Sequence, residues 1–444
     1  MLDSAEAPEM AWYALIRSPL ALALGLAGSV GAASAQPRTC LPAAQNLYVR
    51  DLLQQHYYWN ESLTDPNPTK YGSPEAYLEA VRYLPLDQSY SYIAPKAASQ
   101  AFFSESQFVG LGLSTRLLVS ASGEAVEMRL SEVFPGGPAS GAGLARGDRV
   151  EAINGRPVAD WWLAGQLGDA FGPAAPGVVV ELVLRRGEAA PHTITMAKRV
   201  VTIPPVSDVR VFEVDGVKTG YVVFRTFVEP STAALDAAFA ALQAAGVREL
   251  ILDLRYNGGG LVGVAQHLAS LIGGARTGGQ VLAEYVHNNL NIARNRAIRF
   301  DTPARALTLD RLVVITTRAT ASSSELIING LRPYMPVIVV GDTTYGKPVG
   351  QYAFDFCDKT AFPVAFVLRN ANREANYFFG IPPTCPAVDD LDHALGDVAE
   401  ASLAEALSFV SRGGCSRQTR SFSTRRVDWR STTFSGLAEL IGAW

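Results

Sequence analysis

Four short apolar runs alternate with helical segments between residues 219 and 340, and this alternation restricts the fold more than any other feature of the sequence. The runs predict buried strands at Thr219–Phe224, Leu250–Leu254, Leu312–Thr316 and Val337–Val340. The segments between them predict helices at Thr232–Ala245, Leu261–Ile272 and Ser322–Leu331. This order favours an α/β fold with a largely parallel sheet.

The 444 residues are enough for several domains, and the character of the sequence changes along the chain. Two helices, at 45–58 and 73–83, predict a small helical N-terminal domain. From about residue 108, short strands, the first at Val109–Thr115 and the next at Ala125–Phe134, and glycine turns predict a compact β-rich unit. We therefore expect a signal peptide, a helical domain, a β-rich domain, the α/β domain and a tail that is loosely packed or disordered, at residues 1–35, 36–105, 106–203, 204–415 and 416–444.

The N-terminus has the pattern of a targeting segment. Arg17 precedes an apolar run over residues 19–33, and Ala33-Ser34-Ala35 before Gln36 is a small-residue cleavage pattern. The run is short and rich in glycine for a membrane span, and no later stretch is apolar enough for one. The sequence therefore predicts a periplasmic or secreted protein with no stable membrane span after cleavage. A membrane anchor or an ordinary helix is the alternative.

Four cysteines follow the predicted cleavage point. An even number in an exported chain predicts two disulfides, for which three connectivities exist. We favour Cys357 with Cys385 and Cys40 with Cys415. Free buried thiols are the alternative, because cysteine also packs well in protein cores.

Composition and charge exclude some classes of function. Hydrophobic residues make up 48% of the chain and charged residues 18%, so a large core can form and global disorder is excluded. The net charge is −4, and no long basic run precedes the tail. We therefore expect no nucleic-acid partner.

A run of serines lies where a predicted strand ends and a helix begins. In Thr320-Ala321-Ser322-Ser323-Ser324-Glu325, a serine would sit at a helix N-terminus, where free N–H groups favour a developing negative charge. That position suits the nucleophile of an acyl-transfer reaction. Ser322 and Glu325 also have the spacing of a capping box, which alone would explain both residues.

A lysine follows the next predicted strand. Lys347 stands between Gly346 and Pro348, and a lysine that is partly buried there would lose its preference for the charged form. It could then take a proton from a serine hydroxyl as a general base. The alternative is a solvated lysine in a turn. Both segments follow C-terminal strand ends, where α/β sheets usually place their sites.

A third segment follows the strand at 250–254. Asp253-Leu254-Arg255-Tyr256-Asn257-Gly258-Gly259-Gly260 would let the backbone approach a substrate and could form an anion-binding nest. The alternative is a plain glycine-rich turn. The segment matches neither a dinucleotide-binding nor a P-loop pattern.

Other chemistries lack support. None of the histidines falls in a catalytic context, there is no G-x-S-x-G elbow, and no histidine, cysteine and carboxylate cluster suggests a metal; the histidines are His56, His192, His267, His287 and His393. We therefore expect no cofactor and no metal.

Taken in order, the three segments resemble the C-terminal processing peptidases, also called tail-specific proteases. The resemblance covers roughly residues 45–410 and implies a catalytic core of the ClpP/crotonase type. It implies Ser322 as nucleophile, with Ser324 as the fallback, and Lys347 as general base. Gln351 would orient the lysine or help set the active state. Backbone N–H groups of Gly259 and Ser323 would form the oxyanion hole.

The β-rich unit resembles the PDZ module of the same family. Gly110-Leu111-Gly112-Leu113 resembles the loop that receives a peptide carboxylate on backbone N–H groups. The resemblance implies that an extended peptide is bound by strand addition. The alternative is a β-domain that only positions the protease.

These patterns together predict a serine endopeptidase that acts on unfolded or C-terminal segments of exported proteins by a Ser-Lys mechanism. Two other functions compete with it. One is a PDZ scaffold with a catalytically silent protease domain, and the other is an acyl-thioester enzyme on a similar core. The sequence does not define the oligomeric state.

Overall fold

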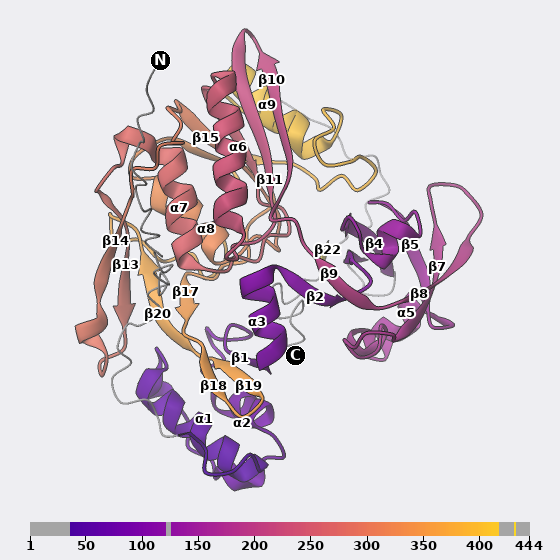
Figure 1. Cartoon of the computed structure of the whole chain (residues 1–444), viewed down its shortest axis with the longest axis vertical. Helices are drawn as coiled ribbons and strands as arrows, with labels where there is room; N and C mark the ends of the chain where they lie inside the picture. Colours follow the sequence, from indigo (N-terminus) through magenta and orange to yellow (C-terminus); the bar gives the residue numbers. More distant parts are fainter. Residues whose placement is uncertain (1–35, 121–125, 417–429, 432–444) are drawn as a thin grey trace, which may run out of the picture. The chain divides into compact units, whose positions relative to one another are not determined.

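The computed structural model describes residues 36–120, 126–416 and 430–431 (Figure 1). The predicted signal peptide at 1–35 and most of the predicted tail lie outside these residues. In the described part of the chain, no helix is both long and apolar enough to cross a membrane.

The predicted parallel sheet is present and has six strands in the order β10-β11-β12-β15-β16-β21. Its five neighbouring strands from β11 to β21 are parallel, and they are β11 (Val217–Phe224), β12 (Glu249–Asp253), β15 (Arg311–Thr316), β16 (Val337–Gly341) and β21 (Cys385–Pro386). β10 (Val206–Val214) adds an antiparallel edge strand that the sequence analysis did not predict. The fold is therefore mixed α/β, as expected.

Helices cover both faces of this sheet (Figure 1). Because side chains alternate along a strand, Leu250 and Leu252 of β12 face one core and Ile251 faces the other. The first core also contains side chains of α6 (Ser231–Ala245), α7 (Val262–Gly273) and α8 (Ser323–Leu331). The second core is closed by α9 (Ala401–Arg412). The four predicted strands, β11, β12, β15 and β16, thus contribute side chains to both cores, which explains their apolar sequences.

Two smaller sheets join the part that contains the parallel sheet to the N-terminal helices. One has the order β14-β13-β20-β17, and the other has the order β1-β19-β18. Their strands are β13 (Val281–His287), β14 (Arg296–Arg299), β17 (Val349–Gln351), β20 (Val364–Arg369), β1 (Tyr92–Pro95), β18 (Phe354–Phe356) and β19 (Lys359–Phe362). The helices are α1 (Pro42–His56), α2 (Pro74–Val81) and α3 (Lys96–Glu105). Leu52 and Tyr77 from these helices share a core with Phe356 and Val364.

The segment expected to be a PDZ module forms a sheet with a core of its own. Its path is β22-β3-β4-β5-β7-β8, with β6 beside β5, and β2 pairs separately with β9. The elements are β2 (Gln107–Gly110), β3 (Leu113–Val119), β4 (Val126–Val133), α4 (Pro138–Gly141), β5 (Arg149–Ile153), β6 (Arg156–Pro157), α5 (Val158–Leu163), β7 (Val179–Arg185), β8 (His192–Ala197), β9 (Arg199–Thr202) and β22 (Arg430–Ser431). The single strand predicted over residues 109–115 is instead broken at Leu111–Gly112, since Gly112 has a φ of 76°.

The expectation of two disulfides is met, but the favoured connectivity is wrong. The bonds join Cys40 to Cys357 and Cys385 to Cys415, with Cα–Cα distances of 5.9 and 5.4 Å. Cys40 precedes α1, and Tyr48 of α1 packs on Phe356 beside Cys357, with ring centroids 5.1 Å apart. Spacing along the chain does not show which elements pack together, so it could not select this pairing.

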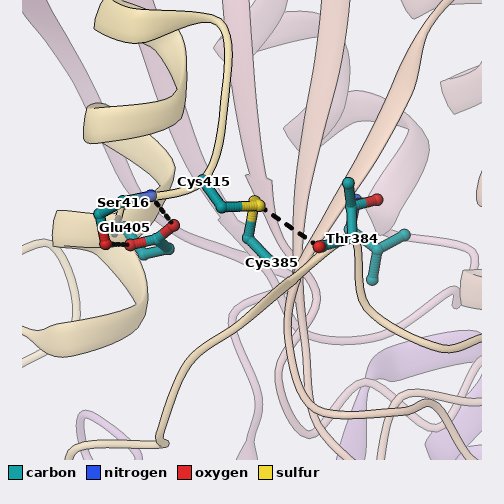
Figure 2. The surroundings of a disulfide bond; sticks show 6 residues. Thr384, Cys385, Glu405, Cys415 and Ser416 are labelled. Carbon is teal, nitrogen blue, oxygen red and sulfur yellow. Dashed lines mark hydrogen bonds between the residues drawn. A yellow bond between two sulfur atoms is a disulfide. The ribbon is translucent and has the colours of Figure 1, made fainter. Parts of the chain in front are cut away.

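The second disulfide fastens the end of α9 to the edge of the parallel sheet. Cys385 begins β21, and Cys415 follows α9, which packs on that sheet (Figure 2). Beside it, the Glu405 carboxylate accepts hydrogen bonds from the backbone N–H and the hydroxyl of Ser416. The two sulfurs are bonded to each other, so they offer no thiolate ligand to a metal.

Candidate active site

The three segments singled out in the sequence meet at one edge of the parallel sheet. They follow β12, β15 and β16, which are consecutive neighbours in the sheet, so their carboxyl ends lie side by side. Hydrogen bonds fasten the serine segment to the glycine segment, and two of them come from the residues that precede Ser322. The Thr320 hydroxyl donates to Leu254 O at 2.8 Å, and the Ala321 N–H donates to Asn257 O at 3.1 Å. This edge therefore carries the candidate site.

Ser322 lies at the point where the chain turns into α8. It is the N-cap residue, with a φ of 55° and a ψ of −114°. A positive φ is unfavourable for a residue with a side chain, and such strain is characteristic of functional sites in proteins. Ser322 and Glu325 also form the capping box that the sequence suggested. The capping box explains Glu325, but it does not explain the strained backbone of Ser322.

The three consecutive serines have different partners. The Ser323 hydroxyl donates to Gly260 O at 2.7 Å, and the Ser324 hydroxyl donates to Asn257 O at 2.9 Å. Both side chains are buried, whereas Ser322 is half-buried. Within the described residues, the Ser322 hydroxyl donates no hydrogen bond. The Ser323 and Ser324 hydroxyls are thus committed to carbonyl groups of the glycine segment, and the Ser322 hydroxyl is not.

Glu325 binds both the serine segment and the lysine segment. Its Oε2 accepts hydrogen bonds from the backbone N–H groups of Ser322 at 2.9 Å and Lys347 at 2.8 Å. Its Oε1 accepts from the Gly346 N–H at 2.7 Å and from the Thr344 hydroxyl. Burial raises the pKa of Glu325 to about 7, and these hydrogen bonds act in the opposite direction. One side chain therefore holds the two segments in a fixed relation.

Lys347 is held by Gln351, four residues further along the chain. Its Nζ donates to Gln351 Oε1 at 2.8 Å, and Gln351 Nε2 donates to Tyr90 O and, at 3.3 Å, to Phe362 O. Burial lowers the pKa of Lys347 to about 8, against the opposing effect of the negative charges of Asp87 and Glu325. A large share of this lysine is consequently neutral near pH 8.

The glycine turn packs directly against the serine segment. A Cβ atom on Gly259 would lie 2.8 Å from Ser322 Cβ and 2.9 Å from Ser323 N, and the φ of Gly259 is 98°. The Gly259 N–H donates to Asn257 Oδ1 at 2.9 Å, so it is already engaged. For the Ser323 N–H we find no acceptor in the part of the chain that the structure describes. Of the two predicted oxyanion donors, the Ser323 N–H is thus open. The Gly259 N–H would first have to leave Asn257 Oδ1.

Comparison with known families decides the classification. The model of the peptidase family S41 matches residues 218–385, and that of the peptidase S41 N-terminal domain matches residues 44–92. The chain therefore carries a peptidase family S41 domain at residues 218–385. The S41 match contains the three segments of the site. The N-terminal match contains Tyr90, whose carbonyl oxygen accepts a hydrogen bond from Gln351.

Related proteins extend this S41 assignment. The C-terminal processing peptidase, chloroplastic, of Tetradesmus obliquus is 31% identical over 242 residues, which is 52% of this chain and 50% of that protein. The chain spans about half the length of the relatives that it matches. A putative S41 protease from Bacteroides fragilis has a similar structure, with a TM-score of 0.67, 26% identity, and coverage of 82% of this chain and 97% of that one. The photosystem II D1 C-terminal processing protease shares the fold at a TM-score of 0.51 and 22% identity, over 82% and 97% of the two chains.

The candidate carboxylate loop of this S41 chain has open N–H groups. The carbonyl oxygens of Leu111 and Gly112 each accept a bond at 2.8 Å, from Ala139 and Phe134. Within residues 36–120, 126–416 and 430–431, the N–H groups of Leu111 and Gly112 donate no hydrogen bond. Gly110 ends β2 and Leu113 begins β3, so the loop leads directly into β3. β3 lies between β4 and the short edge strand β22, with which it pairs antiparallel at Val119 and Leu118.

A buried ionic cluster joins β3 to the glycine turn. Asp389 binds the guanidinium groups of Arg116 on β3, of Arg146 and of Arg255, and it accepts a hydrogen bond from the Tyr256 hydroxyl. Burial alone would raise the pKa of Asp389, but the three guanidinium groups hold it well below its usual range. The Asp389 carboxylate therefore stays charged. It links Arg116 of the β-rich module to Tyr256, which lies next to Asn257 in the glycine segment. No local pattern in the sequence indicates this cluster, because Arg116, Arg146 and Asp389 are far along the chain from residues 255–256.

The histidines do not form a triad with these serines. His267 contacts Asp236 at 2.9 Å between α7 and α6, and burial lowers the pKa of His56 to about 4. Across the described ranges, no hydrogen bond joins a histidine to Ser322, Ser323 or Ser324. Among the described residues, the structure thus gives no support for a Ser-His-Asp triad at these serines.

Proposed function

We propose that this S41 chain is a serine endopeptidase in which Ser322 is the nucleophile and Lys347 the general base. The observation that carries the proposal is the pair of hydrogen bonds to Glu325 Oε2, by which the Ser322 and Lys347 backbones share one buried carboxylate oxygen. A capping box or a solvated turn lysine would account for either segment alone. Neither accounts for their joint attachment to one carboxylate, beside a lysine whose charged form is disfavoured.

The reaction uses the lysine in its neutral form. A neutral amine that donates one N–H to Gln351 Oε1 keeps its lone pair for the Ser322 proton. The alkoxide attacks the peptide carbonyl carbon, and the oxyanion is stabilised by the Ser323 N–H and by the glycine turn after Gly259 releases Asn257. The C–N bond then breaks, and Lys347 gives its proton to the leaving amine. Water, deprotonated by the same lysine, releases the acyl group and restores the Ser322 hydroxyl.

The disulfides support an exported enzyme. Bonds between cysteines persist in oxidising compartments and are rare in the cytosol. Both pairs in this chain are bonded, and one of them spans a sequence separation of 317 residues. Together with the targeting pattern at residues 1–35, they favour the periplasm or the exterior of the cell, with unfolded or C-terminal segments of exported proteins as substrates.

The cleavage assay has a defined dependence on pH. The chain from Gln36 onward is incubated with an unfolded protein, and the fragments are followed by mass spectrometry. Since the neutral amine is the active form and the pKa of Lys347 is about 8, kcat/KM should fall about tenfold per pH unit below pH 8 and level off above it. A rate that is constant between pH 6 and pH 9 would argue against a lysine base. Absence of cleavage at every pH would favour the silent scaffold.

The β-rich module is proposed to bind chain ends as a PDZ domain does. A peptide would add as a strand to β3, with its carboxylate on the open N–H groups of Leu111 and Gly112. The backbone pairing of β22 with β3 supports this reading, because it uses the same edge. It also means that an incoming peptide must displace β22.

Peptide binding should therefore depend on the carboxylate and on β22. With the Ser322→Ala chain, a fluorescent peptide that has a free C-terminus should bind about tenfold to a hundredfold more tightly than its amide, as expected for a charge-assisted hydrogen bond. A chain that ends at Ser416 should bind it more tightly still. Gly112→Ala is the variant that disturbs the carboxylate loop itself, because the added Cβ would lie 2.8 Å from Gly137 Cα. Equal affinity for acid and amide would contradict carboxylate capture.

A further inference from the structure

The turn at residues 87–91, from the N-terminal part of the chain, touches the lysine segment on both sides of Lys347. The Tyr90 hydroxyl donates to Gly346 O, and Ser89 Oγ is hydrogen-bonded to the Tyr345 hydroxyl. Tyr90 O accepts from Gln351 Nε2, and the Tyr90 ring lies 5.8 Å from Lys347 Nζ. The partner that orients Lys347 is thus itself oriented by a backbone carbonyl of this turn.

One buried carboxylate determines the shape of the turn. Asp87 Oδ1 accepts the N–H groups of Tyr90 and Ser91, both at 2.9 Å. Its Oδ2 accepts the Ser91 hydroxyl at 2.6 Å and the Tyr57 hydroxyl at 2.8 Å. Tyr57 follows α1, and Ser91 Oγ also accepts the Val364 N–H of β20 at 2.9 Å. Asp87 therefore fixes the turn between α1 and β20. β20 pairs with β17, the strand that contains Gln351.

The charge of Asp87 has no ion-pair partner in the described part of the chain. Its side chain is completely buried, and the four hydrogen bonds that it accepts come from neutral donors. The charged groups that act on Lys347 are Asp87 from this turn and Glu325 from α8. Both favour the ammonium form of the lysine and oppose the effect of burial.

We propose that Asp87 is a positioning residue for Lys347: it holds the Tyr90 carbonyl on Gln351 and places a negative charge beside the lysine. This inference rests on the proposed Ser-Lys function, because it assigns a task to the base of that mechanism. It gives the N-terminal part of the chain a role in the chemistry, in addition to packing.

The test replaces Asp87 by asparagine, which keeps the shape and removes the charge. The neutral lysine should then be reached at a lower pH, so the acid limb of the kcat/KM profile should move down by about one pH unit. The plateau should also fall, by about tenfold, because the turn is held less firmly. Asp87→Glu should keep the limb near its original position. Tyr57→Phe is the matched control that loosens the turn but keeps the charge, and it should lower the plateau without moving the limb.

A second readout does not require turnover. Labelling with acetic anhydride across the pH range, read at Lys347 by mass spectrometry, reports the protonation of that amine directly. The midpoint for Lys347 should be lower in Asp87→Asn than in the original chain. An unchanged midpoint together with an unchanged plateau would overturn the role of Asp87. If the original chain cleaves nothing while the labelling midpoint still shifts, the proposed peptidase function fails and the electrostatic link between Asp87 and Lys347 stands.

If Asp87→Asn does not fold, its thermal unfolding transition will be lost. The positioning role of Asp87 can then be tested with another variant. Ser91→Ala then takes its place, since it deletes one hydrogen bond to Asp87 and one to Val364 N and leaves the charge in position. A folded Ser91→Ala chain should show a lower plateau with the original limb. Full activity in that variant would contradict the positioning role.

Discussion

Replacing Ser322 with alanine should abolish peptide cleavage, with a loss in kcat on the order of 10⁴-fold to 10⁶-fold, as is found when a serine nucleophile is removed from a protease. The loss follows because no acyl-enzyme can form, while the backbone N–H donors remain. The measurement is the rate of fragment formation from an unfolded protein, with circular dichroism to confirm that the fold is retained.

Ser324→Ala is the matched variant for this experiment. The Ser324 hydroxyl donates to Asn257 O and is buried, so its removal should cost about 1 kcal/mol of folding stability and leave most of the cleavage rate. The opposite result, an inactive Ser324→Ala chain beside an active Ser322→Ala chain, would transfer the nucleophile to Ser324. Equal cleavage by the original chain and by both variants would indicate a contaminating protease.

Replacing Lys347 with arginine should reduce kcat by roughly 10³-fold or more, although charge and length are nearly kept. A guanidinium group does not release its proton at any pH at which the protein is folded, so it cannot take one from Ser322. Lys347→Ala should be equally inactive. The rate should stay low at pH 9, where the original chain is at its plateau.

The stability of the Lys347 variants separates a catalytic lysine from a structural one. Because burial lowers its pKa to about 8, the folded chain binds this proton less readily than the unfolded chain does. Folding is therefore penalised below pH 8, and the penalty fades as pH rises from 8 towards the ordinary lysine value. Lys347→Met removes the penalty, so its unfolding temperature at pH 6 should equal or exceed that of the original chain. An unfolded Lys347→Met or Lys347→Ala chain would instead support a structural role for this lysine.

The amino-acid sequence by itself determined the parallel sheet and the three segments that follow its strands. β12, β15 and β16 are buried on both faces, so each appears in the sequence as a continuous apolar run that needs no partner to be seen. The capping box at Ser322 and Glu325 is likewise local, because its two residues are one helical turn apart. These features place the serine, lysine and glycine segments at one edge of the sheet.

The tertiary structure alone decided the rest, because it depends on contacts between segments that are distant in the sequence. The Ser324 and Ser323 hydroxyls are committed to carbonyl groups of the glycine turn, which distinguishes Ser322 among three identical residues. The disulfide of Cys40 follows from the packing of α1 on β18, and the break in the strand predicted over 109–115 follows from the conformation of Gly112. Asp87 had no local signal at all: its effect on Lys347 arises only when folding brings residue 87 to residue 347, and burial then removes the water that would otherwise screen the two charges.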